Sequence, residues 1–522
     1  MDTLLHRFGS LVKGVITGFD RIVFKGQIRP LLYAAGMQAF LSTHGVLNKN
    51  YKDWVTERSK QIVEYADQYS RDVFGCGVRY IASCYERKET LAHEQQKKLG
   101  IENGLVGIWS CVESCKTFKS TYDAVLGYPQ LRNYSSKCKH LYFYYDHYDY
   151  CFMSIRLQTW APYDIQIALN GREWLRRQLD KRGCGYIISG NKFLHIDDYE
   201  LAQQLLDTQE DTKWEEILNG FIPDVFPSMS QTLFGDSLDY YWTAWQSERA
   251  KDYIFKNPQS LNPHINDLLR HAFLTGTSDR VLRYMGRPVN AQGQPHALSK
   301  PELLSRTNLW YNGMRIRHWV DKNSIKLYNE QNVLRIEMTM NAPGKYRVYR
   351  HTEGQDNSGP KRLLPMRKGV ADIKVRAKVS DERINCFTEH MSTFEDKTPV
   401  SELISSVLQP FISKGKRIRS LDITGKDREL LIAISDPVFD VSYITNKKLQ
   451  AKLGALSWAK GTNQKQLSSK ISRHLRLLRE HGLIKKVPNQ HKYYLTQKGR
   501  EITTALNVML AASTNDLLKI SA

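Results

Sequence analysis

The sequence has no uninterrupted stretch of about 18 uncharged apolar residues, the length that a membrane-spanning helix needs. Its first residues, Met1 to Arg7, lack the apolar core of a secretory signal. Glycine-rich nucleotide-binding loops and His-x-His metal pairs are also missing. These absences argue against a membrane protein and against a protein that binds nucleotides through one of the common glycine-rich loops. We expect a cytoplasmic protein.

Cysteine is sparse, with eight residues spread over 522 positions, so the sequence does not predict the disulfide framework of small secreted domains. Cys111 and Cys115 are separated by three residues and are followed by Cys138 and Cys151. Four thiolates can bind zinc, which makes Cys111 and Cys115 metal candidates. The alternative is that these side chains pack as small buried apolar groups.

Acidic residues are few relative to basic ones: 54 Asp and Glu stand against 75 Lys and Arg, a formal net charge of +21. Residues 313–380 hold 15 basic and 6 acidic residues, and residues 460–500 hold 11 basic residues and one acidic residue, Glu480. These two stretches together carry +19. A cationic excess concentrated in this way indicates a polyanionic partner.

The second basic stretch has the element order of a winged helix-turn-helix. The spacing predicts helices over 427–435, 447–453 (capped by Asn446) and 463–481, the last with Leu467, Ile471, Leu475 and Leu478 on its buried side and Gly482 as terminator. Strands at 483–487 and 492–495 flank a polar turn, and Thr496 caps a closing helix. This region resembles winged helices of the MarR/ArsR type.

The opposite side of the long helix and the hairpin supply the candidate DNA-binding residues, which on this interpretation contact base edges and phosphates. They are Lys465, Ser469, Lys470, Ser472, Arg473, Arg476, Lys485, Lys486, His491 and Lys492. Two alternatives stay open, because winged helices also bind proteins and a basic helix face can simply be solvated. We favour duplex DNA as the partner, since so many like charges repel one another without a polyanion.

A second basic surface is predicted on strands within 314–340, where apolar and polar residues alternate. Its candidate residues are Arg315, Arg317, Lys326, Arg335, Arg347 and Arg350. One interpretation is a solvated sheet face on which Glu337 pairs with Arg335 or Lys326. The other is a surface that follows the phosphates of single-stranded DNA or RNA.

An enzyme is the alternative from a different class. Residues 326–328 (KLY) and 334–337 (LRIE) are similar to strand pairs in the rolling-circle replication initiators of filamentous phage. The resemblance implies Tyr328 and Glu337 as candidate catalytic residues in metal-dependent DNA nicking. The His-x-His metal pair of those proteins is missing here, so we expect no cofactor, and a divalent metal only if the enzyme hypothesis holds.

A two-metal nuclease would need clustered carboxylates. Asp20, Glu89, Glu113, Asp146 and Glu337 have no common spacing motif that would bring them together. The sequence alone therefore does not predict such a site.

The remaining elements predict an α+β protein, with a mixed α/β N-terminal region, antiparallel meanders and a helical middle over 197–285. A strand, a helix and a strand within 78–112 are typical of a βαβ unit. The expected domains are 1–135 (mixed α/β), 136–395 (α+β, with two meanders around the helical middle), 396–425 (connector) and 426–522 (DNA-binding).

Several stretches resemble an uncharacterised family of long bacterial proteins that end in a MarR-like winged helix. The matching segments are 18–23 (GFDRIV), 111–115 (CVESC), 156–160 (RLQTW), 170–175 (NGREWL), 240–243 (YYWT) and 481–486 (HGLIKK). The resemblance implies a bacterial DNA-binding protein that acts in transcription regulation or as the targeting component of a mobile element. Its oligomeric state is left open.

Overall fold

The structure is a computed structural model, which describes residues 3–82, 87–235, 238–287, 289, 301–310, 313–352, 359–392, 400–413, 415–436, 439, 443–487 and 490–511. The chain is mixed α+β and divides into two compact units. The sheet unit comprises Phe8–Leu269 and Ser305–Asn385, and the C-terminal unit comprises Met1–Arg7, Arg270–Leu304 and Cys386–Ala522.

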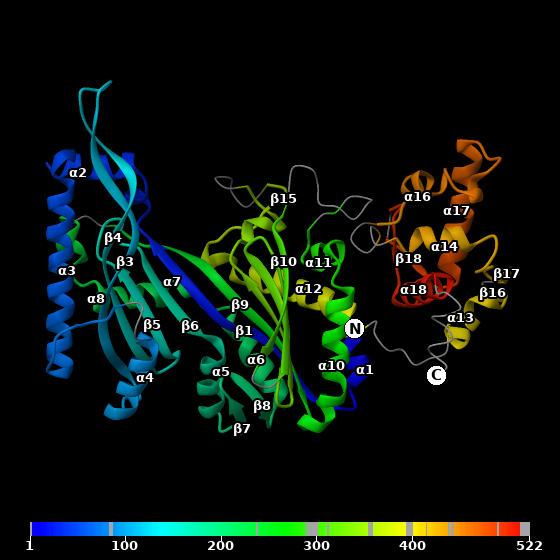
Figure 1. The fold of residues 1–522 in the computed structure, drawn as a ribbon, viewed down its shortest axis with the longest axis horizontal. Coiled ribbons are helices and arrows are strands. Elements are labelled where there is room, and N and C mark those ends of the chain that lie inside the picture. Colours follow the sequence, from blue (N-terminus) through cyan, green and yellow to red (C-terminus); the bar gives the residue numbers. More distant parts are fainter. Residues whose placement is uncertain are drawn as a thin grey trace. The chain divides into compact units, whose positions relative to one another are not determined.

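One mixed sheet dominates the fold, with the strand order β10-β11-β12-β13-β9-β1-β6-β5-β4-β3-β2 (Figure 1). In chain order these strands are β1 (Val12–Gln27), β2 (Arg79–Tyr80), β3 (Gly104–Asp123), β4 (Tyr128–His147), β5 (Cys151–Gln158), β6 (Ile165–Asn170), β9 (Tyr241–Phe255), β10 (Leu303–Trp310), β11 (Gly313–Val320), β12 (Asn323–Glu330) and β13 (Val333–Met340). β2 and β3 are parallel and are joined by α4 (Lys88–Leu99), which confirms the predicted βαβ unit.

The long strands β1 and β9 pair antiparallel in the middle of the sheet (Figure 1). Helix α6 (Tyr199–Gln209) approaches β1 so closely that a Cβ at Gly18 would lie 2.7 Å from Leu206. The prediction that 197–285 is helical throughout is wrong at β9. Consecutive residues of this strand are buried on both faces, so it lacks the alternation that marks a half-buried strand, and its spacing is also compatible with a helix.

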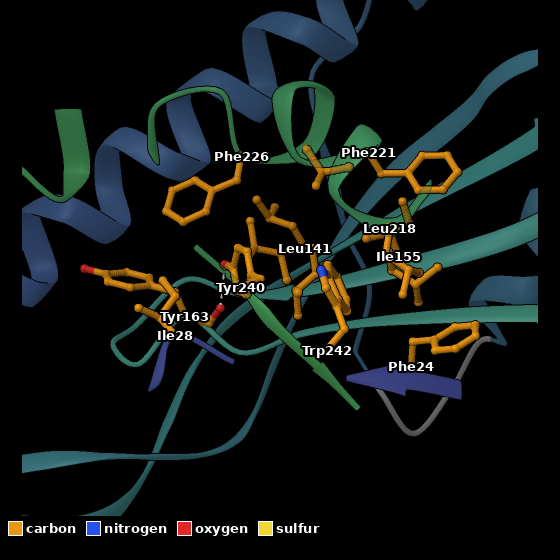
Figure 2. Packing of buried hydrophobic residues seen from close by; sticks show 14 of the residues in the cluster. Phe24, Ile28, Leu141, Ile155, Tyr163, Leu218, Phe221, Phe226, Tyr240 and Trp242 are labelled. Carbon is orange, nitrogen blue, oxygen red and sulfur yellow. Dashed lines mark hydrogen bonds between the residues drawn. The ribbon is translucent and has the colours of Figure 1, made fainter. Parts of the chain in front are cut away.

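The main core lies against one face of this sheet. It is covered by α2 (Ala34–Thr43), α3 (Tyr51–Phe74), α7 (Trp214–Gly220), α8 (Ile222–Val225) and α9 (Met229–Thr232). Figure 2 shows Trp242 of β9 among apolar side chains from several strands and helices. Within this core the Tyr240 hydroxyl donates to the Tyr163 carbonyl oxygen at 2.8 Å, and the Trp242 indole donates to Asn219 at 2.7 Å.

A second layer covers the other face beside β1. It consists of α5 (Gly171–Asp180), α6 and the hairpin β7–β8 (Tyr186–Ser189 and Lys192–Ile196), whose apolar side chains pack on Ile16, Ile254 and Val333. The remaining elements before residue 400 are α1 (Thr3–Phe8), α10 (Pro258–Thr275), α11 (Ser278–Tyr284), the hairpin β14–β15 (Arg347–Arg350 and Arg362–Pro365) and α12 (Ile373–Ser392). None of the described helices has the length and apolar character needed to span a membrane.

In the C-terminal unit, α13 (Val400–Leu408) and the hairpin β16–β17 (Phe411–Ser413 and Lys416–Ile418) occupy the segment that we expected to be a connector. They are followed by α14 (Arg428–Ile434), α16 (Asn446–Leu453), α17 (Gln464–Glu480), the hairpin β18–β19 (Ile484–Lys486 and Tyr493–Leu495) and α18 (Gln497–Ala511). Thr445 rather than Asn446 caps α16, because Asn446 is already the first residue of the helix.

Candidate nucleic-acid interface

Helix α17 is delimited at both ends by local interactions. Asn463 and Gln466 form a reciprocal capping box, in which each side-chain oxygen accepts a hydrogen bond from the other residue's backbone N–H, at 2.9 and 3.0 Å. Gly482 follows the helix with φ +74°, a conformation that favours glycine. Leu467, Ile471, Leu475 and Leu478 are buried as predicted, so the orientation of α17 about its axis is determined.

The opposite side of α17 is open to solvent. Lys465, Ser469, Ser472, Arg473 and Arg476 are all exposed and follow one another at helical spacing. Within the described part of the chain, Lys465, Arg473 and Arg476 have no carboxylate at ion-pair distance. These five residues, which we call the α17 ridge, present positive charge without a direct ion pair, while Glu480 interacts electrostatically with Arg476 from the next turn.

Lys470 is placed differently from its neighbours on α17. Its ammonium donates to the Trp458 carbonyl oxygen at 2.6 Å and lies 4.1 Å from the centroid of the indole ring. The side chain is half-buried, so Lys470 attaches the 457–459 turn to α17 and is not part of the ridge.

The hairpin β18–β19 carries the second group of predicted residues. Lys485, Lys486, His491 and Lys492 are exposed, while positions 488 and 489 of the predicted turn lie outside the described residues. Ile444 pairs with Tyr493 through two backbone hydrogen bonds of 2.7 and 2.9 Å, which adds a third short strand to the hairpin. The sequence does not predict this bridge, because a single paired residue has no periodicity.

Asp427, directly before α14, interacts with side chains from two other parts of the C-terminal unit. Arg419 donates two hydrogen bonds to its carboxylate, at 2.6 and 2.8 Å, and His474 of α17 lies 3.5 Å away. Burial opposes ionisation, but the hydrogen bonds from Arg419 and His474 outweigh it and hold the pKa of Asp427 well below its usual range. The charged carboxylate thus ties α17 to the start of α14.

The predicted second basic surface needs a correction at Arg335. This side chain is 0% exposed. Its guanidinium donates to both carboxylate oxygens of Asp252, at 2.6 and 2.8 Å, and to Asp20 at 3.1 Å. Arg172 of α5 completes the group at 3.0 Å from Asp252. As the alternation predicts, Arg335 lies on the face of β13 opposite the apolar residues. That opposite face is not open to solvent, because α5 and the β7–β8 hairpin cover it.

The candidate catalytic pair lies next to this group. Tyr328 donates its hydroxyl hydrogen bond to Glu337 at 3.2 Å, and Lys326 forms an ion pair with the same carboxylate. Both Tyr328 and Glu337 are buried, and burial raises the pKa of the Tyr328 phenol well above its ordinary value. The pairing of Lys326 with Glu337 was one of the two interpretations considered for this sheet face.

The other members of the second basic surface have mixed environments. Arg317 donates to Ser324 at 3.1 Å and lies 4.2 Å from the centroid of the Trp319 ring, and Arg315 is half-buried. Arg350 donates to the carbonyl oxygens of Pro365 and His351, whereas Arg347 is exposed on β14.

Of the scattered carboxylates, the fold brings two together and leaves the others apart. Asp20 and Glu337 interact electrostatically, and Glu248 and Asp252 of β9, which the sequence did not predict, join them. Glu113 instead pairs with Arg156 at 2.8 Å, and Asp146 pairs with Arg177 at 2.8 Å. Glu89 lies on α4.

Cys111, Cys115, Cys138 and Cys151 form no disulfide, and all four are buried. Over the described ranges, no group of three or more His, Cys, Asp or Glu side chains has an arrangement that could hold a metal ion.

Comparison with known proteins gives no match: no protein-family model, no curated protein and no solved structure corresponds to the chain. The resemblance to long bacterial proteins with a MarR-like C-terminus therefore stays a prediction.

Proposed function

We propose that residues 427–511 form a winged helix that binds duplex DNA, and that the protein acts as a transcription regulator or as the targeting component of a mobile element. The α17 ridge is the observation that carries this proposal. Three unpaired cations and two serines occupy one side of a helix whose other side is fully buried.

The element order supports the winged-helix interpretation. Helix α14, the Ile444 bridge, α16, α17 and the β18–β19 hairpin follow one another as helix, strand, helix, helix and hairpin, which is typical of winged helices. In such domains the third helix enters the major groove and the hairpin lies along the backbone.

The chemistry of the α17 ridge fits a major groove. Ser469 and Ser472 are short, so the helix can approach base edges closely, while Arg473 and Arg476 are long enough to donate to guanine or to phosphate. The exposed Lys485, Lys486 and Lys492 of the hairpin can neutralise phosphates beside the groove.

The test is duplex binding by the full chain carrying Arg473→Ala and Arg476→Ala, measured by gel shift against genomic fragments and by fluorescence anisotropy on a selected site. We expect affinity to fall about 100-fold, because each arginine contact contributes about 1–3 kcal/mol. The circular dichroism spectrum should be unchanged, since both side chains are exposed.

The matched control removes two equally exposed cations from the hairpin β16–β17, with Lys416→Ala and Arg417→Ala. This hairpin lies beside the C-terminal end of α17, one turn beyond Arg476, where Ser413 donates to Glu480 at 2.9 Å. The control should retain nearly full affinity. Equal losses in the two variants would mean that net charge alone drives binding, and the ridge would not be the DNA site.

A further inference from the structure

An exposed aromatic surface lies on the main sheet, around Tyr241 and Trp245 of β9. We propose that this surface, together with Arg29, Lys25 and Lys368, binds single-stranded nucleic acid by stacking bases on its rings. The proposal is independent of duplex binding by α17, because all five residues belong to the sheet unit.

The pleat of β9 explains why these rings face solvent. Tyr240 and Trp242 point into the main core (Figure 2), so Tyr241 and Thr243 between and after them point to the opposite side. Trp245 occupies a β-bulge, since Ala244 pairs with Phe24 and Gln246 pairs with the next residue back, Val23. The bulge leaves the indole 45% exposed, and Tyr241 is 37% exposed.

Cations surround both rings. The ammonium groups of Lys25 and Lys368 each lie 5.1 Å from the centroid of a Trp245 ring, and the Arg29 guanidinium lies 3.5 Å from the Tyr241 ring centroid. A base can stack on the exposed part of the Trp245 ring or on the Arg29 guanidinium that covers Tyr241, and the neighbouring cations can pair with its phosphate.

The positive charges are only partly compensated. Lys25 forms an ion pair with Asp164 at 2.6 Å. Arg29 and Lys368 have no carboxylate at ion-pair distance within the described ranges of the chain. An anion at this surface would therefore meet two uncompensated cations beside two exposed rings.

The segment that carries Lys368 is fixed beside β9. The Ala244 N–H donates to the Lys368 carbonyl oxygen at 2.9 Å, and Gly369 forms a β-bridge with Thr243. The same segment begins with Lys361 and Arg362, which are exposed on and before β15. The backbone of a bound strand can thus extend from Trp245 along further cations.

The occupant is single-stranded rather than duplex, because a duplex stacks its bases on one another and hides their faces. Stacking on an aromatic ring accepts every base, so the surface should have little sequence preference.

The test uses the full chain with fluorescein-labelled dT20 and U20, followed by anisotropy. We expect Trp245→Ala to lower affinity for at least one of them about 10-fold, which is the size of one lost stacking interaction. Trp245→Phe should retain most of the affinity because it keeps a ring. Tyr122→Ala, which removes an aromatic side chain that is 69% exposed elsewhere in the sheet unit, should have no effect.

The two proposals fail separately. Trp245→Ala should leave duplex binding intact, whereas the Arg473→Ala and Arg476→Ala variant should leave dT20 and U20 binding intact. The relative affinities for dT20 and U20 identify DNA or RNA as the preferred strand. If neither oligonucleotide binds, or if Trp245→Ala binds both like the unmodified chain at an unchanged melting temperature, the proposal is overturned and the cation–aromatic contacts only stabilise the fold.

Discussion

At the scale of single residues, the sheet unit is notable for buried charge. Arg172, Arg335, Asp20 and Asp252 form a group of two cations and two anions. Burial raises the pKa of Asp20, an effect that Arg335 partly offsets, while the two arginines outweigh burial at Asp252 and lower its pKa. Charges removed from water are tolerated only when they are paired in this way.

Two buried histidines should make the stability of the sheet unit depend on pH. Burial and the charge of Arg156 lower the pKa of His140 to about 4, and burial lowers the pKa of His318 to about 4. The unfolded chain binds these protons near pH 6.5, so lowering the pH from 6.5 to 4 favours unfolding. We expect each imidazole to contribute about 2 kcal/mol of lost stability at pH 5.

The measurement is urea unfolding at pH 7 and pH 5. The variant with His140→Gln and His318→Gln should lose less stability between these two pH values than the unmodified protein. His491→Gln, at an exposed position, is the control and should behave like the unmodified protein. An equal loss in the double variant would show that other groups cause the acid sensitivity.

At the scale of elements, the stability of α17 depends on the residues at its two ends. Asn463→Ala removes the capping box and should lower the unfolding free energy by about 1 kcal/mol. Gly482→Ala places a Cβ on a residue with φ +74° and should cost about 1 kcal/mol. Hydrogen–deuterium exchange within 464–480 should accelerate in both variants. Gly220→Ala, where a Cβ meets open space and φ is not positive, should leave stability nearly unchanged.

Strands show the limits of element prediction more clearly than helices do. The meander β11–β12–β13 was predicted from alternation and is confirmed, with Lys326 opposite Glu337 and Arg315 opposite Tyr328. β9 was missed, and β3 runs to Asp123, well beyond the predicted strand-helix-strand segment that ends at 112. A long strand that is buried on both faces in one part and exposed on one face in another has no single periodicity of apolar residues. Its ends are therefore difficult to predict from the sequence.

At the scale of the whole molecule, the net charge of +21 predicts that the affinity for duplex DNA falls as the salt concentration rises. If Lys465, Arg473, Arg476, Lys485 and Lys486 each neutralise one phosphate, the logarithm of the duplex affinity should fall with the logarithm of salt concentration with a slope of about −4.5. Removing Arg473 and Arg476 should reduce the slope by about 2. An unchanged slope would indicate that the rest of the positive charge attracts the DNA.

The two compact units are defined by contacts between segments and not by the order of those segments in the chain. The domain boundary predicted at residue 135 is wrong, because β4 runs through this position as one continuous strand. The C-terminal unit also contains residues 270–304, far from its other members in sequence. Such a division depends on which distant segments pack together, and composition carries no signal for it.

The sequence by itself determined the local features of the C-terminal unit: the ends of α17, its buried leucine stripe and its exposed cations. Each of these depends on neighbours within a few turns of the chain. Only the tertiary structure decided that Arg335 is buried and that Trp245 is exposed. Alternation assigns a side chain to one face of a strand, but whether α5 or solvent covers that face depends on segments more than a hundred residues away.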